Sequence, residues 1–171
     1  SEGDMKTIRS DLDFFCANFY RGFYIEKTAD GIKRKAVCPT DDFTAMNWAV
    51  TPEAVDYLIE YYYNRYKMPM ILSENGVALS EWKTLDGTVP DDMRIDYIRR
   101  HIERIKKMAE KYPVKGYFYW SFTDNFEWSL GYTKRFGLVY VDYETLERIP
   151  KKSAYWYKKV IGTNGEDLSN D

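Results

Sequence analysis

The sequence predicts an α/β fold in which helices connect the strands of a parallel sheet. Short apolar runs at residues 12–20, 69–73 and 114–121 have the length of buried strands. Between these runs, residues 52–66 and 94–111 carry apolar side chains at spacings of three and four, which is the pattern of one buried helix face. Strands that alternate with such helices are typical of right-handed βαβ units, in which successive strands lie parallel.

A hairpin is expected after the first strand. Residues 21–39 show no consistent alternation of polar and apolar side chains. Within them, Asp30-Gly31 is a turn signal between the apolar residues 23–25 and 36–37. These two apolar stretches are therefore the expected arms of the hairpin.

The two long helices are marked by different signals. Thr51 followed by Pro52 predicts a helix whose first turn is capped by the Thr51 side chain. Residues 94–111 form the most regular element, with isoleucines at positions 95, 98, 102 and 105 opposite a charged face. His101 belongs to this charged helix, and we expect it to be solvated or to flank the exposed face.

The remaining elements complete one continuous unit. Residues 74–76 end the second strand in a turn, residues 138–143 form a later strand, and residues 153–161 form a closing helix. No repeat and no linker rich in proline, glycine or serine divides the chain. Residues 1–171 are therefore expected to be a single unit without an internal domain boundary.

Composition and charge exclude several classes of protein. The chain has 171 residues, of which 44% are hydrophobic and 30% are charged, and this is typical of a globular domain. Its 25 basic and 27 acidic residues give a net charge of −2, so we expect no nucleic-acid partner. No apolar run reaches the roughly 20 residues that cross a bilayer, and the N-terminal SEGD lacks a signal-peptide pattern. No membrane association and a cytoplasmic location are expected.

The few cysteines and histidines limit the chemistry further. Cys16 and Cys38 do not make a disulfide framework, and together with His101 they have no recognised zinc-ligand spacing. Cys16 lies in an apolar run and is expected to be a small buried residue. We therefore expect no metal, no cofactor and no histidine-based nucleophilic triad.

Aromatic residues are unusually abundant. The chain contains 16 Tyr, 9 Phe and 5 Trp, which together make 18% of its residues. Either the core is aromatic, or rings line a surface or a cleft. Sugars pack their C–H faces on rings while their hydroxyls reach polar neighbours, so this composition favours a carbohydrate ligand.

Two features carry candidate chemistry. Glu74 directly follows an apolar strand, at the end where active sites of parallel α/β folds lie, although a simple turn carboxylate has the same signature. Residues 116–128 are dominated by aromatic side chains and also contain Asp124, Asn125 and Glu127. Buried beside rings, each of these three would need partners or would cost about 1–3 kcal/mol. A loop that lines a ligand site removes this difficulty.

Three motifs, in order along the chain, now carry a resemblance to a known family. NFY at residues 18–20 is similar to the N-Y-Y strand end of glycoside hydrolase family 1, the β-glucosidase family, and SENG at residues 73–76 resembles its T-E-N-G motif. WSFTDNFEWSLGYTKRFGLVYVD at residues 120–142, followed by RIPK at residues 148–151, resembles its C-terminal signature. The resemblance covers roughly residues 12–163.

The resemblance implies an incomplete fold. Family members form a whole (β/α)8 TIM barrel, and this chain resembles its C-terminal part, about strands six to eight with their helices. The family's general acid/base belongs to an Asn-Glu-Pro motif, and no such tripeptide occurs in the sequence. The chain is therefore expected to be a partial barrel, a fragment that lacks the acid/base.

The resemblance also implies catalytic residues. Glu74 matches the nucleophile of a retaining mechanism, which forms a covalent glycosyl-enzyme. Tyr20 matches the tyrosine whose hydroxyl hydrogen-bonds that nucleophile, and Asn18 matches an amide beside the same site.

Substrate-binding residues follow from the same motifs. Trp120 matches the platform beneath the sugar, Glu127 and Trp128 match the residues that bind its outer hydroxyls, and Phe136 matches a wall of the pocket. Trp48 resembles the tryptophan on the aglycone side. Members that take phosphorylated sugars usually have a small residue in place of Glu127, so an unphosphorylated β-glucoside or β-galactoside is the expected substrate. The family commonly has a cis peptide at the step that corresponds to Trp120-Ser121.

Three functions remain open at this stage. The chain is the C-terminal portion of a retaining β-glycosidase whose activity requires the rest of the barrel. Alternatively, it is a catalytically inactive partial barrel that self-associates and binds sugars weakly, or a structural subunit beside another chain. A partial barrel exposes strand edges and an apolar inner face. Its expected partners are a β-linked sugar substrate and either the missing N-terminal part of the barrel or another copy of itself.

Overall fold

A three-stranded parallel sheet lies at the centre of the computed structural model, which describes residues 3–35 and 41–170. Its strands are β1 (Phe15–Asn18), β4 (Met70–Asn75) and β5 (Val114–Tyr119), in the order β1-β4-β5. Both neighbouring pairs are parallel. The predicted α/β fold with a parallel sheet is therefore confirmed for these strands.

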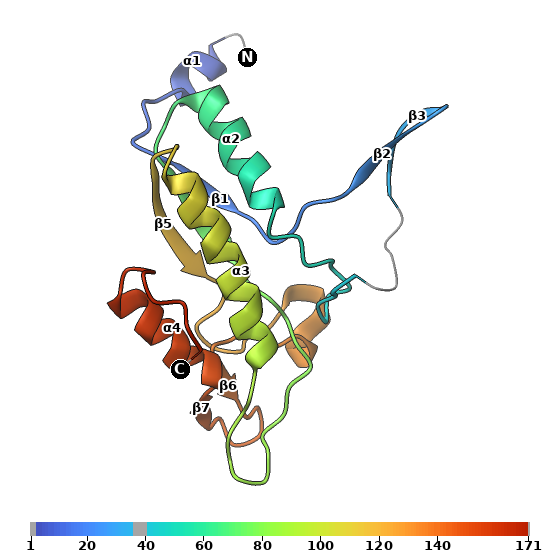
Figure 1. The fold of residues 1–171 in the computed structure, drawn as a ribbon, viewed down its shortest axis with the longest axis vertical. Helices are drawn as coiled ribbons and strands as arrows, with labels where there is room; N and C mark the ends of the chain where they lie inside the picture. The colour runs from blue at the N-terminus through green and yellow to red at the C-terminus, as the bar shows by residue number, and fades with distance from the viewer. Residues whose placement is uncertain (1–2, 36–40, 171) are drawn as a thin grey trace.

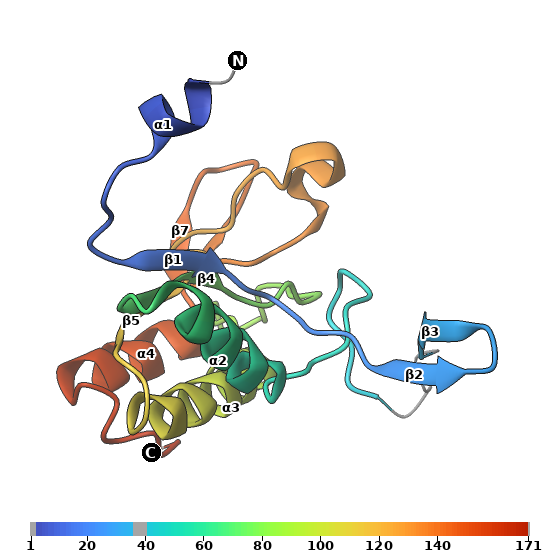
Figure 2. The ribbon, with the colours of Figure 1, turned by 90° about the horizontal axis from the view of Figure 1, so that it is seen from above.

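Helices pack on one face of this sheet. α2 (Ala54–Tyr66) follows β1, α3 (Asp92–Ala109) follows β4, and α4 (Lys152–Gly162) comes after β5. Figure 2 shows these three helices on the same side of the strands. The short α1 (Asp4–Ile8) near the N-terminus stands apart from the sheet and its helices (Figure 2) and has no buried residue.

The alternation of side chains along β4 explains which face is covered. Met70 and Leu72 are buried against α2 and α3, where they join an apolar cluster with Val55 and Ile59. Ile71 points to the other face, beside Phe118 and Gly116 of β5. A second cluster, formed largely by the isoleucines of α3 together with residues of α4, fills the space between those two helices. The core thus lies between the sheet and the helices.

The opposite face of the sheet carries no helix among the described residues. Phe118 leaves 59% of its surface exposed there. Cys16, on β1, is also exposed, so the prediction that it is buried is wrong. The apolar run that suggested burial is real, but strand alternation directs Cys16 to the uncovered face while its neighbours Phe15 and Ala17 face the helices.

Two small antiparallel ribbons complete the fold. β2 (Ile25–Thr28) and β3 (Gly31–Arg34) form the expected hairpin around Asp30-Gly31, and it extends away from the body of the molecule (Figure 1). Its predicted second arm, residues 36–37, lies outside the described residues. β6 (Val139–Val141) pairs with β7 (Arg148–Pro150), so the predicted later strand exists but does not extend the parallel sheet.

Three local predictions need correction. Thr51 does not cap α2: its hydroxyl accepts a hydrogen bond from the Gly22 amide at 2.8 Å, and the helix begins at Ala54. β4 continues through Glu74 and Asn75 instead of turning at them. His101 is fully buried within α3, because the helix is covered by neighbouring elements over more than its isoleucine stripe.

Within residues 3–35 and 41–170, no helix has the length and apolar character needed to span a membrane.

Candidate active site

The carboxyl ends of the three parallel strands meet at one edge of the sheet. Asn18 ends β1 and pairs in register with Glu74 near the end of β4, while Trp120 directly follows β5. Together with later segments they form a pocket of about 470 Å3. Its lining comprises Asn18, Tyr20, Trp48, Glu74, Trp120, Asn125, Phe126, Glu127, Trp128 and Phe136. All eight residues predicted for the site therefore border one pocket.

Glu74 and Tyr20 are joined by a short hydrogen bond. The Tyr20 hydroxyl donates to Oε2 of Glu74 at 2.6 Å. Burial of the phenol, followed by its bond to Glu74, raises the pKa of Tyr20 far above its ordinary value, so the hydroxyl stays protonated and remains a donor. Asn18 pairs with Glu74 across the two strands, and its Oδ1 accepts a hydrogen bond from Ser73 Oγ at 2.8 Å. The carboxylate of Glu74 is thus oriented from a neighbouring strand end.

Rings form the walls of this pocket. Tyr20 contacts Trp48 and Phe136 edge-on, with ring centroids 5.6 and 6.1 Å apart, so the three rings make one cluster. Trp128 leaves 84% of its surface exposed at the pocket. Large exposed rings next to carboxylates are unusual for packing and typical of a surface that stacks a ligand.

A second carboxylate faces the same space. Glu127 is half-buried at the start of η1 (Trp128–Thr133), and its backbone amide donates to Gly131 O at 2.7 Å. Burial and, secondly, the charge of Glu74 raise the pKa of Glu127 above its ordinary value. The negative charges of Glu74 and Glu127 therefore repel each other within the same pocket.

The end of β4 and the segment after β5 are in direct backbone contact. The Trp120 amide donates to Asn75 O at 2.8 Å. A Cβ placed on Gly76 would lie 1.8 Å from the carbonyl oxygen of Trp120, so only glycine fits there. The Trp120-Ser121 peptide bond is cis, as predicted. This contact sets Trp120 beside the strand that carries Glu74.

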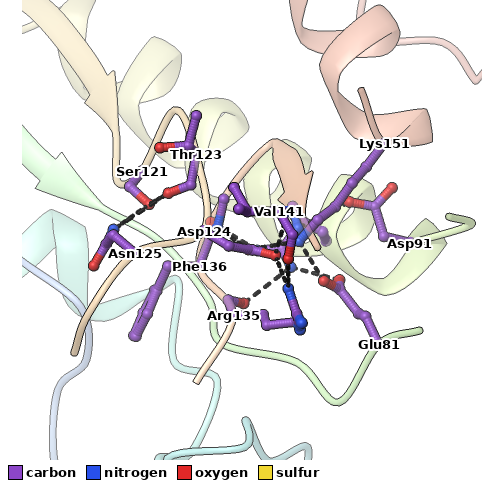
Figure 3. A network of polar contacts seen from close by, with 12 residues as sticks. Glu81, Asp91, Ser121, Thr123, Asp124, Asn125, Arg135, Phe136, Val141 and Lys151 are labelled. Carbon is purple, nitrogen blue, oxygen red and sulfur yellow. Dashed lines mark hydrogen bonds and ion pairs between the residues drawn. The ribbon is translucent and has the colours of Figure 1, made fainter. Parts of the chain in front are cut away.

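A cluster of buried charges adjoins Phe136, one of the residues that line the pocket (Figure 3). We call Glu81, Asp91, Arg94, Asp124, Arg135 and Lys151 the charge cluster. Asp124 is enclosed between Arg135 Nη1 at 2.6 Å and Lys151 Nζ at 3.0 Å. Lys151 also contacts Glu81, which in turn pairs with Arg94. The prediction that Asp124 faces a ligand is therefore wrong, because both oxygens of its buried carboxylate form ion pairs with Arg135 and Lys151.

The charge cluster holds the segments that carry the pocket residues. Asp124 Oδ1 accepts a hydrogen bond from the Gly137 amide at 2.9 Å, and Arg94 Nη1 donates to Phe136 O at 3.0 Å. The Ser121 amide also donates to Phe136 O, at 3.2 Å. These bonds fix residues 120–128 against residues 135–141, and Trp120 and Phe136 border the same pocket.

Some site features carried no clear sequence signal. Asn125 and Phe126 border the pocket although only the composition of their segment pointed to it. Arg94 opens the predicted helix and looks like one more solvated arginine, yet it is fully buried. Its partners come from residues 77–81, 91, 119 and 135–136, and only the fold brings them together.

Among the described residues, no group of histidine, cysteine and carboxylate side chains is arranged to hold a metal ion.

The chain is similar to proteins of one family over most of its length. The model of glycosyl hydrolase family 1 matches residues 1–166. The chain belongs to this family. A family 1 structure, the β-glucosidase of Thermotoga maritima in complex with glucoimidazole, superposes with a TM-score of 0.87 at 39% identity. The alignment covers 97% of this chain and 38% of that one.

The alignments with curated relatives of family 1 cover similar shares of the two chains. β-Glucosidase A of T. maritima is 41% identical over 165 residues, which cover 95% of this chain and 37% of the relative. A bifunctional β-D-glucosidase/β-D-fucosidase of Bifidobacterium breve is 38% identical and is covered to 39% of its length. The chain thus spans less than two fifths of these relatives. It is part of a TIM barrel, and its described residues do not form a closed one.

Proposed function

We propose that this chain carries the nucleophile and the sugar-binding residues of a retaining β-glycosidase. The hydrogen bond from Tyr20 to Glu74, in a pocket walled by rings, is the observation that carries the proposal. An oriented carboxylate at the end of a parallel strand is placed to attack the anomeric carbon of a sugar that lies on Trp120. The attack forms a bond between Glu74 and that carbon while the bond to the leaving group breaks.

Unphosphorylated β-glucosides and β-galactosides are the proposed substrates. The three relatives named above act, by their names, on β-glucosides or β-fucosides. Glu127 and Trp128 border the pocket, and we propose that they bind the outer hydroxyls of the sugar. A carboxylate in this position repels a sugar phosphate, which is why we propose a neutral sugar. Trp48 and Phe136 close the remaining walls.

The general acid/base is proposed to come from the rest of the barrel. A retaining enzyme needs a second carboxyl about 5–5.5 Å from the nucleophile, across the glycosidic bond. Glu127 is the other carboxylate of the pocket, but we assign it to the far end of the sugar. The sequence contains no Asn-Glu-Pro motif, and the relatives are more than twice as long as the part that this chain matches. This chain alone is then competent for glycosylation only by substrates with activated leaving groups.

The uncovered sheet face supports a second candidate, an inactive partial barrel. Phe118 and Phe122 expose 59% and 75% of their surfaces, and Phe14 before β1 is half exposed. Burial of such a face needs either the remaining part of the barrel or another copy of this chain. In the second case the chain self-associates and serves as a sugar-binding or structural subunit.

Covalent labelling distinguishes the two candidates. The chain is incubated with 2,4-dinitrophenyl 2-deoxy-2-fluoro-β-glucoside, whose dinitrophenolate leaves without a proton, and its intact mass is measured. We expect one fluoroglucosyl adduct, mapped by peptide sequencing to Glu74, and no hydrolysis of cellobiose. The control variant Glu74→Gln keeps the size of the side chain and must not be labelled. A folded sample without an adduct would contradict catalytic competence of this chain and favour the inactive partial barrel.

A further inference from the structure

Tyr97 lies outside the pocket, yet it is hydrogen-bonded to the backbone of a pocket residue. It belongs to α3 and is 3% exposed. Its hydroxyl donates to the carbonyl oxygen of Tyr20 at 3.0 Å. Burial raises the pKa of Tyr97 well above its ordinary value, so this hydroxyl remains a donor across the physiological range.

Asn75, the residue after Glu74, completes the connection. Its Nδ2 donates to the Tyr97 hydroxyl at 3.1 Å and to Phe19 O at 2.8 Å, and its Oδ1 accepts from the Tyr117 hydroxyl at 2.8 Å. The side chain of Asn75 is fully buried. A chain of hydrogen bonds therefore runs from β5 through β4 and α3 to the residues that follow β1.

These bonds involve the neighbours of the Tyr20–Glu74 pair along the chain. Asn75 adjoins Glu74 in sequence, and Phe19 adjoins Tyr20. The Phe19 amide also donates to Glu74 O at 2.7 Å. The hydroxyl of Tyr97 is the point at which α3 contacts both strand ends, since it receives from Asn75 and donates to Tyr20.

We propose that Tyr97 is a positioning residue, which fixes the main chain of Tyr20 and thereby holds the Tyr20 hydroxyl on the Glu74 carboxylate. The proposal rests on the nucleophilic role of Glu74. Tyr97 is itself fixed, because its ring packs on His101 with centroids 4.1 Å apart. Loss of its hydroxyl leaves the Tyr20 carbonyl and one Asn75 donor without this partner in a dry environment, so residues 19–20 shift to regain hydrogen bonds.

The test compares two tyrosine-to-phenylalanine variants in the labelling reaction described above. Tyr97→Phe keeps the ring and its contact with His101 but removes the hydroxyl. Tyr63→Phe, on α2, removes the hydroxyl of a half-buried tyrosine that packs on Tyr112 away from the pocket, and is the matched control. For Tyr97→Phe we expect the maximal labelling rate to fall about tenfold, because a small misplacement of a reacting group is costly. The half-saturating concentration of the reagent changes less than twofold, and Tyr63→Phe labels like the original chain.

A crystal structure of Tyr97→Phe provides a readout that does not depend on catalysis. We expect the distance from the Tyr20 hydroxyl to Glu74 Oε2 to lengthen from 2.6 Å beyond hydrogen-bonding range. If Tyr97→Phe labels at the original rate, the proposal is overturned while the function of Glu74 stands. If the unmodified chain is not labelled, the proposed function fails, and an unchanged Tyr20–Glu74 distance in the variant then overturns the positioning role as well.

A second variant covers the case in which Tyr97→Phe does not fold. Tyr117→Phe removes the donor to Asn75 Oδ1 and leaves the Tyr97 hydroxyl in place. For this variant we expect the maximal labelling rate to fall by less than in Tyr97→Phe, and the half-saturating concentration of the reagent to stay unchanged. A rise in the half-saturating concentration that matches the fall in rate would indicate general loosening of the pocket and would overturn the proposal.

Discussion

His101 shows how one buried side chain creates a dependence on pH. Its Nδ1 lies 2.8 Å from the carbonyl oxygen of Tyr97, so Nδ1 carries the proton of the neutral ring and donates it there. Nε2 is buried and has no hydrogen-bond partner among the described residues. Protonation at Nε2 would place an unpaired charge in the core. Burial, assisted by the nearby Arg100 and opposed by the Tyr97 carbonyl and Glu53, lowers the pKa of His101 to about 4.

Acid should therefore destabilise the chain through His101. The folded-state pKa of about 4 lies below the ordinary value of 6.5, so the unfolded chain takes up the proton first. Stability from this residue is present above pH 6.5 and is lost as the pH falls from about 6.5 to about 4, by about 3 kcal/mol in total. Urea denaturation across this range measures it. The variant His101→Phe keeps a ring on Tyr97 but has no group that titrates there. Its free energy of unfolding should therefore fall less than that of the original chain over the same pH range. An equal fall in the two proteins would contradict the assignment to His101.

The segment between β5 and β7 is the element that joins stability to the pocket. Asp124 lies at its centre, with Arg135 and Lys151 as ion-pair partners and the Gly137 amide as a donor. Gly137 has no room for a side chain, since a Cβ there would lie 2.1 Å from the Asp124 amide nitrogen. The wall that carries Trp120, Glu127 and Phe136 is thus built on buried charges instead of a regular strand.

Removal of one charge from this element should be costly. Asp124→Asn keeps the shape but leaves Lys151 and Arg135 without their buried counter-charge, so we expect a loss of about 3–5 kcal/mol in the free energy of unfolding. Asp30→Asn breaks the exposed pair with Lys33 and should cost less than about 1 kcal/mol. Urea unfolding at pH 7 compares the two. Similar losses in both variants would show that the charge cluster does not support the element as described.

At the scale of the whole molecule, β5 is an edge strand, because it pairs only with β4 among the described residues. Beside α4 this edge forms a groove of about 530 Å3, which we call the edge groove, lined mainly by apolar and aromatic side chains such as Phe118, Phe122 and Tyr157. A parallel strand with an unpaired edge and exposed rings is a template for association. The relatives of this chain have more than half their length in the part that it does not match.

The chain should therefore self-associate when no other part of the barrel is present. Size exclusion over a range of concentrations should show species heavier than the 20.3 kDa monomer. The double variant Phe118→Ser/Phe122→Ser should shift the equilibrium to the monomer by at least about tenfold, because each substitution removes a large apolar surface from the edge groove. Trp82→Ser removes a similarly exposed ring that does not line the edge groove, and it serves as the control. A monomer at all concentrations would contradict self-association.

Local signals account for the elements that the sequence predicted well. The helix at residues 94–111 and the strands that contain Met70 and Val114 have strong periodicity or compact apolar runs, and they appear within a few residues of their predicted ends. The motifs around Glu74 and Trp120 lie at strand ends, and parallel strands bring such ends together. For this reason the eight residues that the motifs single out border one pocket.

The sequence by itself determined the alternation of strands and helices, the family and the residues that gather in the pocket, because each depends on local patterns and short motifs. Tertiary structure alone decided the burial of His101 and Asp124, the exposure of Cys16 and the contact of Tyr97 with Tyr20. Each of these depends on which elements pack against a given side chain, and partners such as Tyr20 and Tyr97 lie 77 residues apart in the sequence. Their proximity follows from the fold, since no local pattern records the neighbours that a residue acquires in three dimensions.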